Sequence, residues 1–395
     1  MKSQLSRMVR REYLPLARPT IGEEEIQEVV ATLRSGWITT GPKVELFEKR
    51  FQDYLGVPET VAVSSGTAGL HLALLAAGVG PGDEVITSSM TFAATANAIV
   101  LCGAKPVLVD CAPGTLNIDL DGLQARISDR TKVLIPVHFA GQPCAMDELL
   151  EMARRRGVCI IEDAAHALGT EYKGRRVGAI GDMTVFSFHP IKAITTGEGG
   201  MVVTRNKEWS ERMRLLRFHG ITTSAWKRHS GGRSPQYSIQ LPGFKYTMMD
   251  LQAAIGIHQM DKLDRFIEQR TKLARLYGLA FEKIEGLKPL SMVPYPQRHA
   301  WHLFVVQLEV ERLDVGRDDF LELLRERNIG SGIHFPALHL QPYYQEKWGY
   351  RRGDFPNAER ASERILSLPL FPDMSEDDVK DVIEAVGEVL AEHMK

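Results

Sequence analysis

The sequence predicts an α/β protein whose central sheet is parallel or mostly parallel and is covered by helices on both faces. From about residue 60 to residue 204, apolar runs of strand length alternate with helical patterns. Glycine, proline and aspartate separate the two kinds of segment, as they do at turns. Such a strand and helix alternation is typical of parallel sheets, because each parallel connection needs a crossover that a helix usually supplies.

The strands of this sheet are expected where apolar runs end in polar residues. The expected strands are 60–64, 84–87, 106–110, 132–139 and 158–162, and a helical stretch follows each of the first four. Two further apolar runs, one from Met183 and one at 201–204, flank a turn. Ligands bind beyond the carboxyl ends of strands in sheets of this kind. The polar residues at those ends are Ser64, Thr87, Asp163 and Ser187.

Beyond residue 205 the pattern predicts a second, smaller domain. A helical stretch to about 217 leads into an aperiodic segment, 218–246, and loops of that length are usually functional or disordered. A long helix is then expected at 250–285. The small α+β unit after it has expected strands at 302–308 and 330–334, and expected helices at 317–326, 357–366 and 375–392. The predicted domains are 1–250, a large α/β unit with an N-terminal arm, and 251–395, the linking helix with the small unit.

The composition is that of an ordinary globular protein and argues against several classes of partner. Of the 395 residues, 44% are apolar and 25% charged, and the formal net charge is -2. The longest basic run, within 152–156, is too short to indicate a nucleic-acid or membrane surface. The N-terminus lacks the apolar core of a signal peptide, and no stretch has the length of a membrane span. We therefore expect a cytoplasmic protein that binds neither nucleic acid nor membranes.

The cysteine and histidine patterns predict no metal site. His334 and His339 lie close together but lack the glutamate of an HExxH zinc motif. The cysteines form no CxxC pair, so structural thiols in a reducing compartment are expected. They are Cys102, Cys111, Cys144 and Cys159.

Lys192 lies in the turn between two apolar runs and is the best candidate for a covalent catalyst. Burial between apolar strands lowers the pKa of an ammonium group, and a neutral amine can attack a carbonyl to form a Schiff base. Asp163 follows the apolar run 158–162, and a parallel sheet would bring it beside the lysine. The pair suggests a pyridoxal phosphate enzyme, in which a lysine holds the cofactor aldehyde and an acidic residue pairs with the ring nitrogen. The alternative is an ordinary solvated lysine.

A phosphate cradle is predicted where the first strand gives way to a helix of small and apolar residues. The segment 64–69 reads Ser-Ser-Gly-Thr-Ala-Gly. Gly66 lets the backbone approach closely, a helix N-terminus favours an anion, and the Thr67 hydroxyl adds a donor. Ser187, at the end of its own strand, can supply another hydroxyl to the same phosphate. The alternative is an ordinary serine or threonine N-cap.

Two ring side chains are candidates for contact with a planar cofactor. Phe92 begins a helix directly after a strand end, where its face can stack on a ring. His166 comes three residues after Asp163 and can hydrogen-bond or stack near the cofactor. A core phenylalanine and a satisfied core histidine remain open as alternatives. The cradle, the ring stacker, the aspartate and the lysine together favour the pyridoxal phosphate interpretation.

The chain resembles the sugar aminotransferases of the DegT/DnrJ/EryC/StrS type across nearly its whole length. The motifs that carry the resemblance are SGWITTGPK at 35–43, VSSGTA at 63–68, IEDAAH at 161–166, FSFHPIK at 186–192 and GEGG at 197–200. Further segments are most similar to the branch of UDP-4-amino-4-deoxy-L-arabinose:oxoglutarate aminotransferases. They are FHG at 218–220, SGGR at 230–233, PGFKY at 242–246, HAWHLF at 299–304 and SLPLFPDM at 367–374. The chain departs from that branch at Phe92, where the branch has tryptophan, and at Pro336, where it has arginine.

The resemblance implies a fold type I transferase, with the cofactor bound by the large domain and both active sites of a homodimer at the subunit interface. Lys192 would hold pyridoxal phosphate covalently and shuttle a proton between cofactor and substrate carbons. Asp163 would keep the ring nitrogen protonated, and His166 would lie beside the ring. Lys245 stands where the family commonly has an asparagine that reaches the neighbouring subunit's phosphate; lysine can bind phosphate as a point charge. The remaining cofactor contacts implied are Gly66, Thr67 and Ser187 to the phosphate and Phe92 on the ring.

The implied reaction is a ping-pong transamination. Glutamate would convert the cofactor to pyridoxamine phosphate and leave as 2-oxoglutarate, and a nucleotide-linked 4-keto sugar would then accept the amine. The expected acceptor is UDP-4-ketopentose, giving UDP-4-amino-4-deoxy-L-arabinose for lipid A or polysaccharide biosynthesis; other UDP- or dTDP-keto sugars are alternatives. The candidate substrate contacts are Thr40, Arg233 and His334.

Three other functions are weighed against this one. A sugar dehydratase of the same family would be implied to have histidine in place of Lys192. A non-catalytic sensor built on the same fold would have no need of both Lys192 and Asp163. A nicotinamide-dependent oxidoreductase would need a glycine fingerprint between a strand and a helix, and the glycines at 78–82 follow a helix instead.

Overall fold

A seven-stranded sheet forms the centre of the computed structural model, which describes residues 8–222 and 236–395. The strands lie in the order β1-β9-β8-β5-β4-β2-β3. Their bounds are β1 Glu59–Val63, β2 Glu84–Ser88, β3 Lys105–Val109, β4 Thr131–Ile135, β5 Cys159–Asp163, β8 Met183–Ser187 and β9 Gly200–Thr204. Only β9 runs against its neighbours β1 and β8, and every other pair is parallel. The predicted fold class, a mostly parallel sheet in an α/β protein, is confirmed.

Helices cover both faces of this sheet because successive side chains of a strand point to opposite faces. On β8, Val185 packs in one core with α3 and α7, while Phe186 packs in another with α2 and α9. The sheet is therefore buried on both sides, as parallel sheets usually are. The helices around it are α1 Glu23–Arg34, α2 Pro42–Leu55, α3 Gly66–Ala76, α4 Ala93–Leu101, α5 Leu120–Arg126, α6 Met146–Arg156 and α7 Lys207–Leu216, with a 3-10 turn at Phe139–Gly141.

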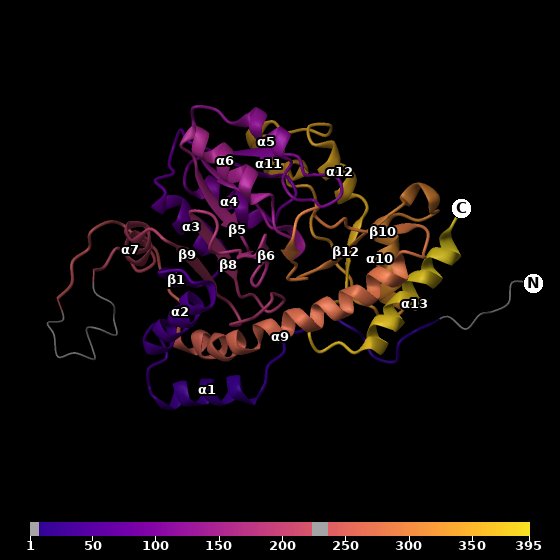
Figure 1. Ribbon diagram of the computed structural model, residues 1–395, viewed down its shortest axis with the longest axis horizontal. Helices are drawn as coiled ribbons and strands as arrows, with labels where there is room; N and C mark the ends of the chain where they lie inside the picture. The colour runs from indigo at the N-terminus through magenta and orange to yellow at the C-terminus, as the bar shows by residue number, and fades with distance from the viewer. Residues whose placement is uncertain (1–7, 223–235) are drawn as a thin grey trace, which may run out of the picture.

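The helix α9, Asp250–Phe281, joins the two halves of the molecule. Its 32 residues span about 48 Å at the usual rise of an α-helix. Figure 1 shows it running from α1 and α2 to α13 at the C-terminal end of the molecule. Phe266 and Ile267 pack in the core of the large sheet, whereas Leu273 and Tyr277 pack in the C-terminal core. A domain boundary near residue 250 remains a proposal, because this one helix contributes to both cores.

The C-terminal part is an α+β unit built on a small antiparallel sheet in the order β10-β12-β13. Its strands are β10 Leu287–Pro289, β12 Phe304–Leu308 and β13 Ile365–Leu368, and its helices are α10 Arg317–Glu326, α11 Pro342–Trp348, α12 Pro356–Ser362 and α13 Glu376–His393, with 3-10 turns at Val310–Arg312 and Leu338–Leu340. A third small sheet joins β6 Glu171–Tyr172, β7 Arg175–Arg176 and β11 Gln297–Arg298.

Three sequence predictions need correction. The expected strand at 330–334 is wrong, since only isolated bridges occur there, between Ile329 and Leu14 and between Gly332 and Ser367. The expected helix 357–366 ends at Ser362, and the apolar residues that follow form β13, all of them buried. The strand expected at 132–139 ends at Ile135, directly before a proline, which has no N–H to donate to a ladder.

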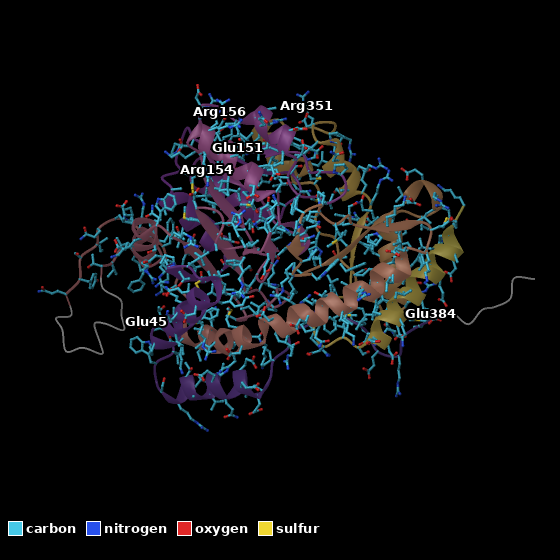
Figure 2. The ribbon with its side chains drawn as sticks, in the orientation of Figure 1. Glu45, Glu151, Arg154, Arg156, Arg351 and Glu384 are labelled. Carbon is cyan, nitrogen blue, oxygen red and sulfur yellow. The ribbon has the colours of Figure 1, made fainter. Side chains whose placement is uncertain are left out.

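The basic run at 152–156 lies on the outer side of α6. Figure 2 shows Glu151, Arg154 and Arg156 projecting from this helix at the rim of the molecule. All three side chains are exposed, and Glu151 pairs with Arg155 one turn away. The run is therefore the solvated face of a surface helix whose other face packs Leu149 into a core.

Within the described ranges, no helix is long and apolar enough to cross a membrane. The four cysteines are free thiols, and three of them are buried.

Glu48 on α2 is a buried carboxylate that ties three elements together. It accepts hydrogen bonds from the backbone N–H of Ala62 on β1 and from Arg214 and Arg217 at the end of α7, all between 2.8 and 2.9 Å. Burial raises the pKa of the Glu48 carboxyl, but Arg217 and Arg214 outweigh that effect and hold the pKa below its ordinary value. The ionised side chain therefore fixes α2 and α7 against β1, the strand that leads into α3.

We predict that Glu48→Gln lowers the free energy of unfolding by roughly 2 kcal/mol, because the half-buried guanidinium groups of Arg214 and Arg217 lose their charged hydrogen-bond acceptor. The matched control is Asp53→Asn, which removes the charge from the exposed Lys49–Asp53 pair and should cost less than about 0.5 kcal/mol. Urea unfolding followed by circular dichroism measures both. Equal unfolding midpoints for the two variants would contradict the role given to Glu48.

Candidate active site

One cavity of about 350 Å³ opens at the carboxyl ends of β1, β5 and β8. This is the edge at which parallel α/β sheets bind ligands. Eight of the candidate residues line it: Gly66, Thr67, Phe92, Asp163, His166, Ser187, Lys192 and His334. They come from five separate segments of the chain, so the fold brings them together rather than the local sequence.

Lys192 reaches the cavity from the turn after β8. Its backbone N–H donates to the carbonyl of His189 at 2.9 Å, and the Phe188 carbonyl accepts bonds from both Thr195 and Thr196, which closes the turn. Burial lowers the pKa of the Lys192 ammonium from its ordinary 10.5 to about 8, although the nearby Asp163 carboxylate opposes the shift. A substantial fraction of this side chain is therefore a neutral amine at mildly alkaline pH.

Asp163 ends β5 and is 6% exposed. One carboxylate oxygen accepts the N–H of Ala165 at 3.1 Å, and the other accepts the hydroxyl of Thr95 at 2.7 Å. These two bonds fix the orientation of the carboxylate toward the cavity that it lines.

The predicted phosphate cradle lies at the N-terminus of α3, an 11-residue helix. Ser65 caps the helix, since its hydroxyl oxygen accepts the N–H of Ala68 at 3.1 Å. A Cβ on Gly66 would lie 3.0 Å from the Ser187 side chain, and a Cβ on Gly200 would lie 2.7 Å from the Ser65 backbone. The cradle can form only with small residues at both positions. Free N–H groups at a helix N-terminus beside two hydroxyls suit a phosphate.

Two aromatic walls flank the cavity. Phe92 is 60% exposed and its ring centre lies 5.7 Å from that of Phe335. The His166 ring stacks on Phe335 at 5.7 Å and lies 4.2 Å from His302. Burial, helped by Lys192 and His334, holds the pKa of His166 well below its ordinary value, so this ring is neutral. The Nδ1 atom of His166 has no hydrogen-bond partner among the described residues.

His334 enters the cavity from the C-terminal half of the chain. Its Nδ1 lies 2.9 Å from the Ser367 hydroxyl of β13. Burial and the nearby Lys192 lower the pKa of His334 to about 4, so it is a neutral hydrogen-bonding group at physiological pH. The position is consistent with a contact to substrate.

The other candidate residues lie away from this cavity. Thr40 and Lys245 line a second cavity of about 630 Å³. The Thr40 hydroxyl donates to the Met248 carbonyl at 2.6 Å, and the Lys245 ammonium lies 4.4 Å from the centre of the Phe218 ring. Arg233 lies outside the described residues. A single chain therefore does not bring Thr40 or Lys245 to Lys192.

Several cavity residues were missed in the sequence analysis. They are Ser65, Thr91, His189, Glu198 and Phe335. Ser65 could have been found from its place before a glycine at a helix start, and His189 and Glu198 belong to the quoted motifs. Phe335 gives no local signal, since its position depends on how the C-terminal half packs on the large sheet. Among residues 8–222 and 236–395, no group of three or more histidine, cysteine or acidic side chains could hold a metal.

This chemistry defines a class of protein. A lysine of lowered pKa, an anchored carboxylate and an anion cradle suit a cofactor that carries an aldehyde, a basic ring nitrogen and a phosphate. Pyridoxal phosphate carries all three groups, and Gly66 and Gly200 let Ser187 and the Ser65 backbone lie close to the start of α3, where the phosphate would bind. The fold and the cavity thus define a pyridoxal phosphate-dependent enzyme.

Comparison with known proteins gives the family. The model of the DegT/DnrJ/EryC1/StrS aminotransferase family matches residues 19–387, and the chain belongs to this family. The predicted enzyme class, a pyridoxal phosphate-dependent sugar aminotransferase, is thereby confirmed.

The relatives match the whole chain. The spore coat polysaccharide biosynthesis protein SpsC of Bacillus subtilis is 49% identical over 385 residues, which is 96% of this chain and 98% of SpsC. The uncharacterised protein MJ1066 of Methanocaldococcus jannaschii is 50% identical over 386 residues, 98% of this chain and all of that one. The putative sugar aminotransferase Spr1654 of Streptococcus pneumoniae, in its PLP form, is 34% identical with a TM-score of 0.88, covering 96% of this chain and 99% of Spr1654. None of these three names specifies the arabinose branch, so that finer assignment remains a proposal.

We predict that apo protein captures pyridoxal phosphate at a rate that rises about tenfold per pH unit up to about pH 8 and then levels off. Only the neutral amine of Lys192 attacks an aldehyde, and its fraction rises as pH approaches the pKa from below. The measurement is the absorbance of the covalent adduct after rapid mixing. The Lys192→Ala variant, followed by cofactor fluorescence, corrects for pH effects on non-covalent binding. A midpoint near 10.5 would contradict the desolvated site.

Proposed function

We propose that the protein transfers the amino group of glutamate to a nucleotide-linked 4-keto sugar, with UDP-4-ketopentose as the first candidate and UDP-4-amino-4-deoxy-L-arabinose as the product. The observation that carries this proposal is the lysine of lowered pKa in one cavity with an anchored carboxylate and a helix N-terminus. Membership of the aminotransferase family supports the reaction class. The sugar and its nucleotide are the finer part of the proposal.

Pyridoxal phosphate, when bound, supplies the electron sink that lowers the barrier to breaking a C–H bond beside the amine. Lys192 would hold the cofactor covalently and, when free, would accept and return the proton at its Nζ atom. A pKa of about 8 suits both steps, because the group can carry and lose a proton near neutral pH. Lys192 is thus both anchor and general base in this proposal.

The other residues of the cavity would bind and orient the cofactor. Asp163, fixed by Thr95 and Ala165, would pair with the ring nitrogen and keep a proton there. Phe92 and the neutral ring of His166 would contact the planar ring. Ser65 caps the helix α3, and the N–H groups at Gly66 and Thr67 and the Ser187 hydroxyl would bind the phosphate.

A homodimer with shared active sites is part of the proposal. Lys245 and Thr40 line a cavity separate from that of Lys192, and Phe92 is largely exposed although it faces the cofactor cavity. A second copy that covers Phe92 would bring a cation such as Lys245 toward the phosphate. Arg233 and His334 remain the proposed contacts to the sugar nucleotide.

A second candidate substrate is a UDP- or dTDP-linked ketohexose. Phe92 and Pro336 both depart from the arabinose branch, and SpsC, similar along its whole length, is named for spore coat polysaccharide biosynthesis. A sugar dehydratase is disfavoured by Lys192, and a non-catalytic sensor by retention of both Lys192 and Asp163. A nucleotide-linked keto sugar therefore remains the proposed acceptor of the amine.

We predict that the purified holoenzyme is yellow and that glutamate bleaches its visible band with release of one 2-oxoglutarate per site. Adding UDP-4-ketopentose should restore the band and give an aminated product by mass spectrometry, with dTDP- and UDP-4-ketohexoses as the comparison panel. Lys192→Ala should slow turnover by roughly 10³-fold or more, since it removes the proton carrier. A band that survives glutamate, or a Lys192→Ala variant that retains turnover, would falsify the transaminase proposal.

A further inference from the structure

Thr91 and Thr95 form a buried hydroxyl chain that leads to Asp163. Thr91 is 1% exposed and Thr95 is not exposed at all. The two hydroxyl oxygens lie 2.8 Å apart, and the Thr95 oxygen lies 2.7 Å from a carboxylate oxygen of Asp163. Both threonines belong to the segment that begins α4 and carries Phe92, yet the reaction as described above gives Thr91 no part.

Counting hydrogens fixes the direction of this chain. Each threonine hydroxyl has one hydrogen to donate, and an ionised carboxylate can only accept. The Thr95 hydroxyl donates its one hydrogen to Asp163. In the hydrogen bond between the two threonines, Thr91 must therefore be the donor and Thr95 the acceptor. A donor whose own oxygen accepts a hydrogen bond is polarised and donates more strongly.

The Thr95 hydroxyl contacts the Asp163 oxygen that accepts no backbone hydrogen bond within the described parts of the chain. The other oxygen of Asp163 accepts the Ala165 N–H, so Thr95 is the donor to this oxygen among the described residues. A hydrogen bond to a carboxylate favours its ionised form over its protonated form. Any proton that Asp163 shares with a partner base is therefore pushed toward the partner.

Resting on the proposed function, we propose that Thr95, oriented by Thr91, is a positioning residue that keeps the proton shared between Asp163 and the cofactor on the ring nitrogen. The proton can sit on the nitrogen beside an ionised carboxylate, or on the carboxyl group beside a neutral ring. The Thr95 hydroxyl stabilises the first arrangement. The protonated ring is the better electron sink. Thr91 and Thr95 would therefore influence how strongly the cofactor ring withdraws electrons without contacting the substrate.

The test is the ¹⁵N chemical shift of the ring nitrogen in holoenzyme reconstituted with ¹⁵N-labelled pyridoxal phosphate, followed against pH. In Thr95→Val the ratio of nitrogen-protonated to carboxyl-protonated forms, read from the ¹⁵N shift at neutral pH where the pair holds one proton, should fall about ten- to hundredfold, since a charge-assisted hydrogen bond to the carboxylate is lost. Thr95→Ser should restore the wild-type shift. Thr91→Val should change the shift by less, because Thr95 keeps its hydroxyl but loses the group that orients it.

The matched control is Thr32→Val, which removes a buried threonine hydroxyl on α1 that donates to the Glu28 carbonyl. It should leave the ring nitrogen unchanged. The other titratable groups that line the cavity are present in every variant, so their effects are common to all: Lys192, His166, His189, Glu198 and His334.

The outcomes separate this inference from the function on which it rests. A ring nitrogen that is unprotonated at neutral pH in wild-type enzyme overturns the role proposed for Asp163 and the inference with it. A protonated wild-type ring whose ¹⁵N shift at neutral pH is the same in Thr95→Val overturns the inference alone. If Thr95→Val does not fold, an unchanged ¹⁵N shift in Thr91→Val overturns it instead.

Discussion

The active cavity depends on one constraint, which is the parallel pairing of β5 with β8. In this register Asp163 lies opposite Val185, two residues before β8 ends, so the carboxylate and the turn that carries Lys192 meet at the same edge. An ammonium beside a carboxylate would ordinarily have a raised pKa. Here the loss of water outweighs that attraction and the pKa of Lys192 falls to about 8. The burial of Lys192 therefore makes its side chain a more reactive amine, even with a carboxylate nearby.

The reversed strand β9 makes the phosphate cradle possible. It lies between β1 and β8, and its first residue, Gly200, pairs with both Val63 and Ser187. Strand β9 therefore separates the end of β8, at Ser187, from the end of β1, which leads into α3. At this level β9 contributes only Gly200, which has no side chain. Any side chain at Gly200 would collide with the Ser65 backbone. The Gly-Gly that closes the quoted GEGG motif thus has a steric reason, independent of any contact with substrate.

Most of the cofactor frame could be predicted because strand ends and helix starts leave local signals. Lys192, Asp163 and Gly66 each follow an apolar run, and the alternation of strand and helix predicts which edge they share. The residues that the C-terminal part of the chain contributes to the cavity could not be predicted in the same way. The residues 365–368 are all buried, and three of the four are apolar, so their pattern does not distinguish a strand from the end of a helix. Phe335 and the Ser367 partner of His334 depend on long-range packing and leave no periodic signal.

His334 and Lys192 line the same cavity, and contacts of α9 outside that cavity help to position His334. Near the middle of that helix, buried Arg270 donates to the carbonyls of Trp301, His302 and Leu370, which fixes the segments on either side of the small sheet. That sheet includes β13, whose Ser367 hydroxyl contacts His334. Because the N-terminal half of α9 is packed in the large core, the small sheet cannot shift without moving the helix. The helix α9 therefore connects the core of the large sheet to the core of the small sheet, and it links the position of His334 to the sheet that positions Lys192.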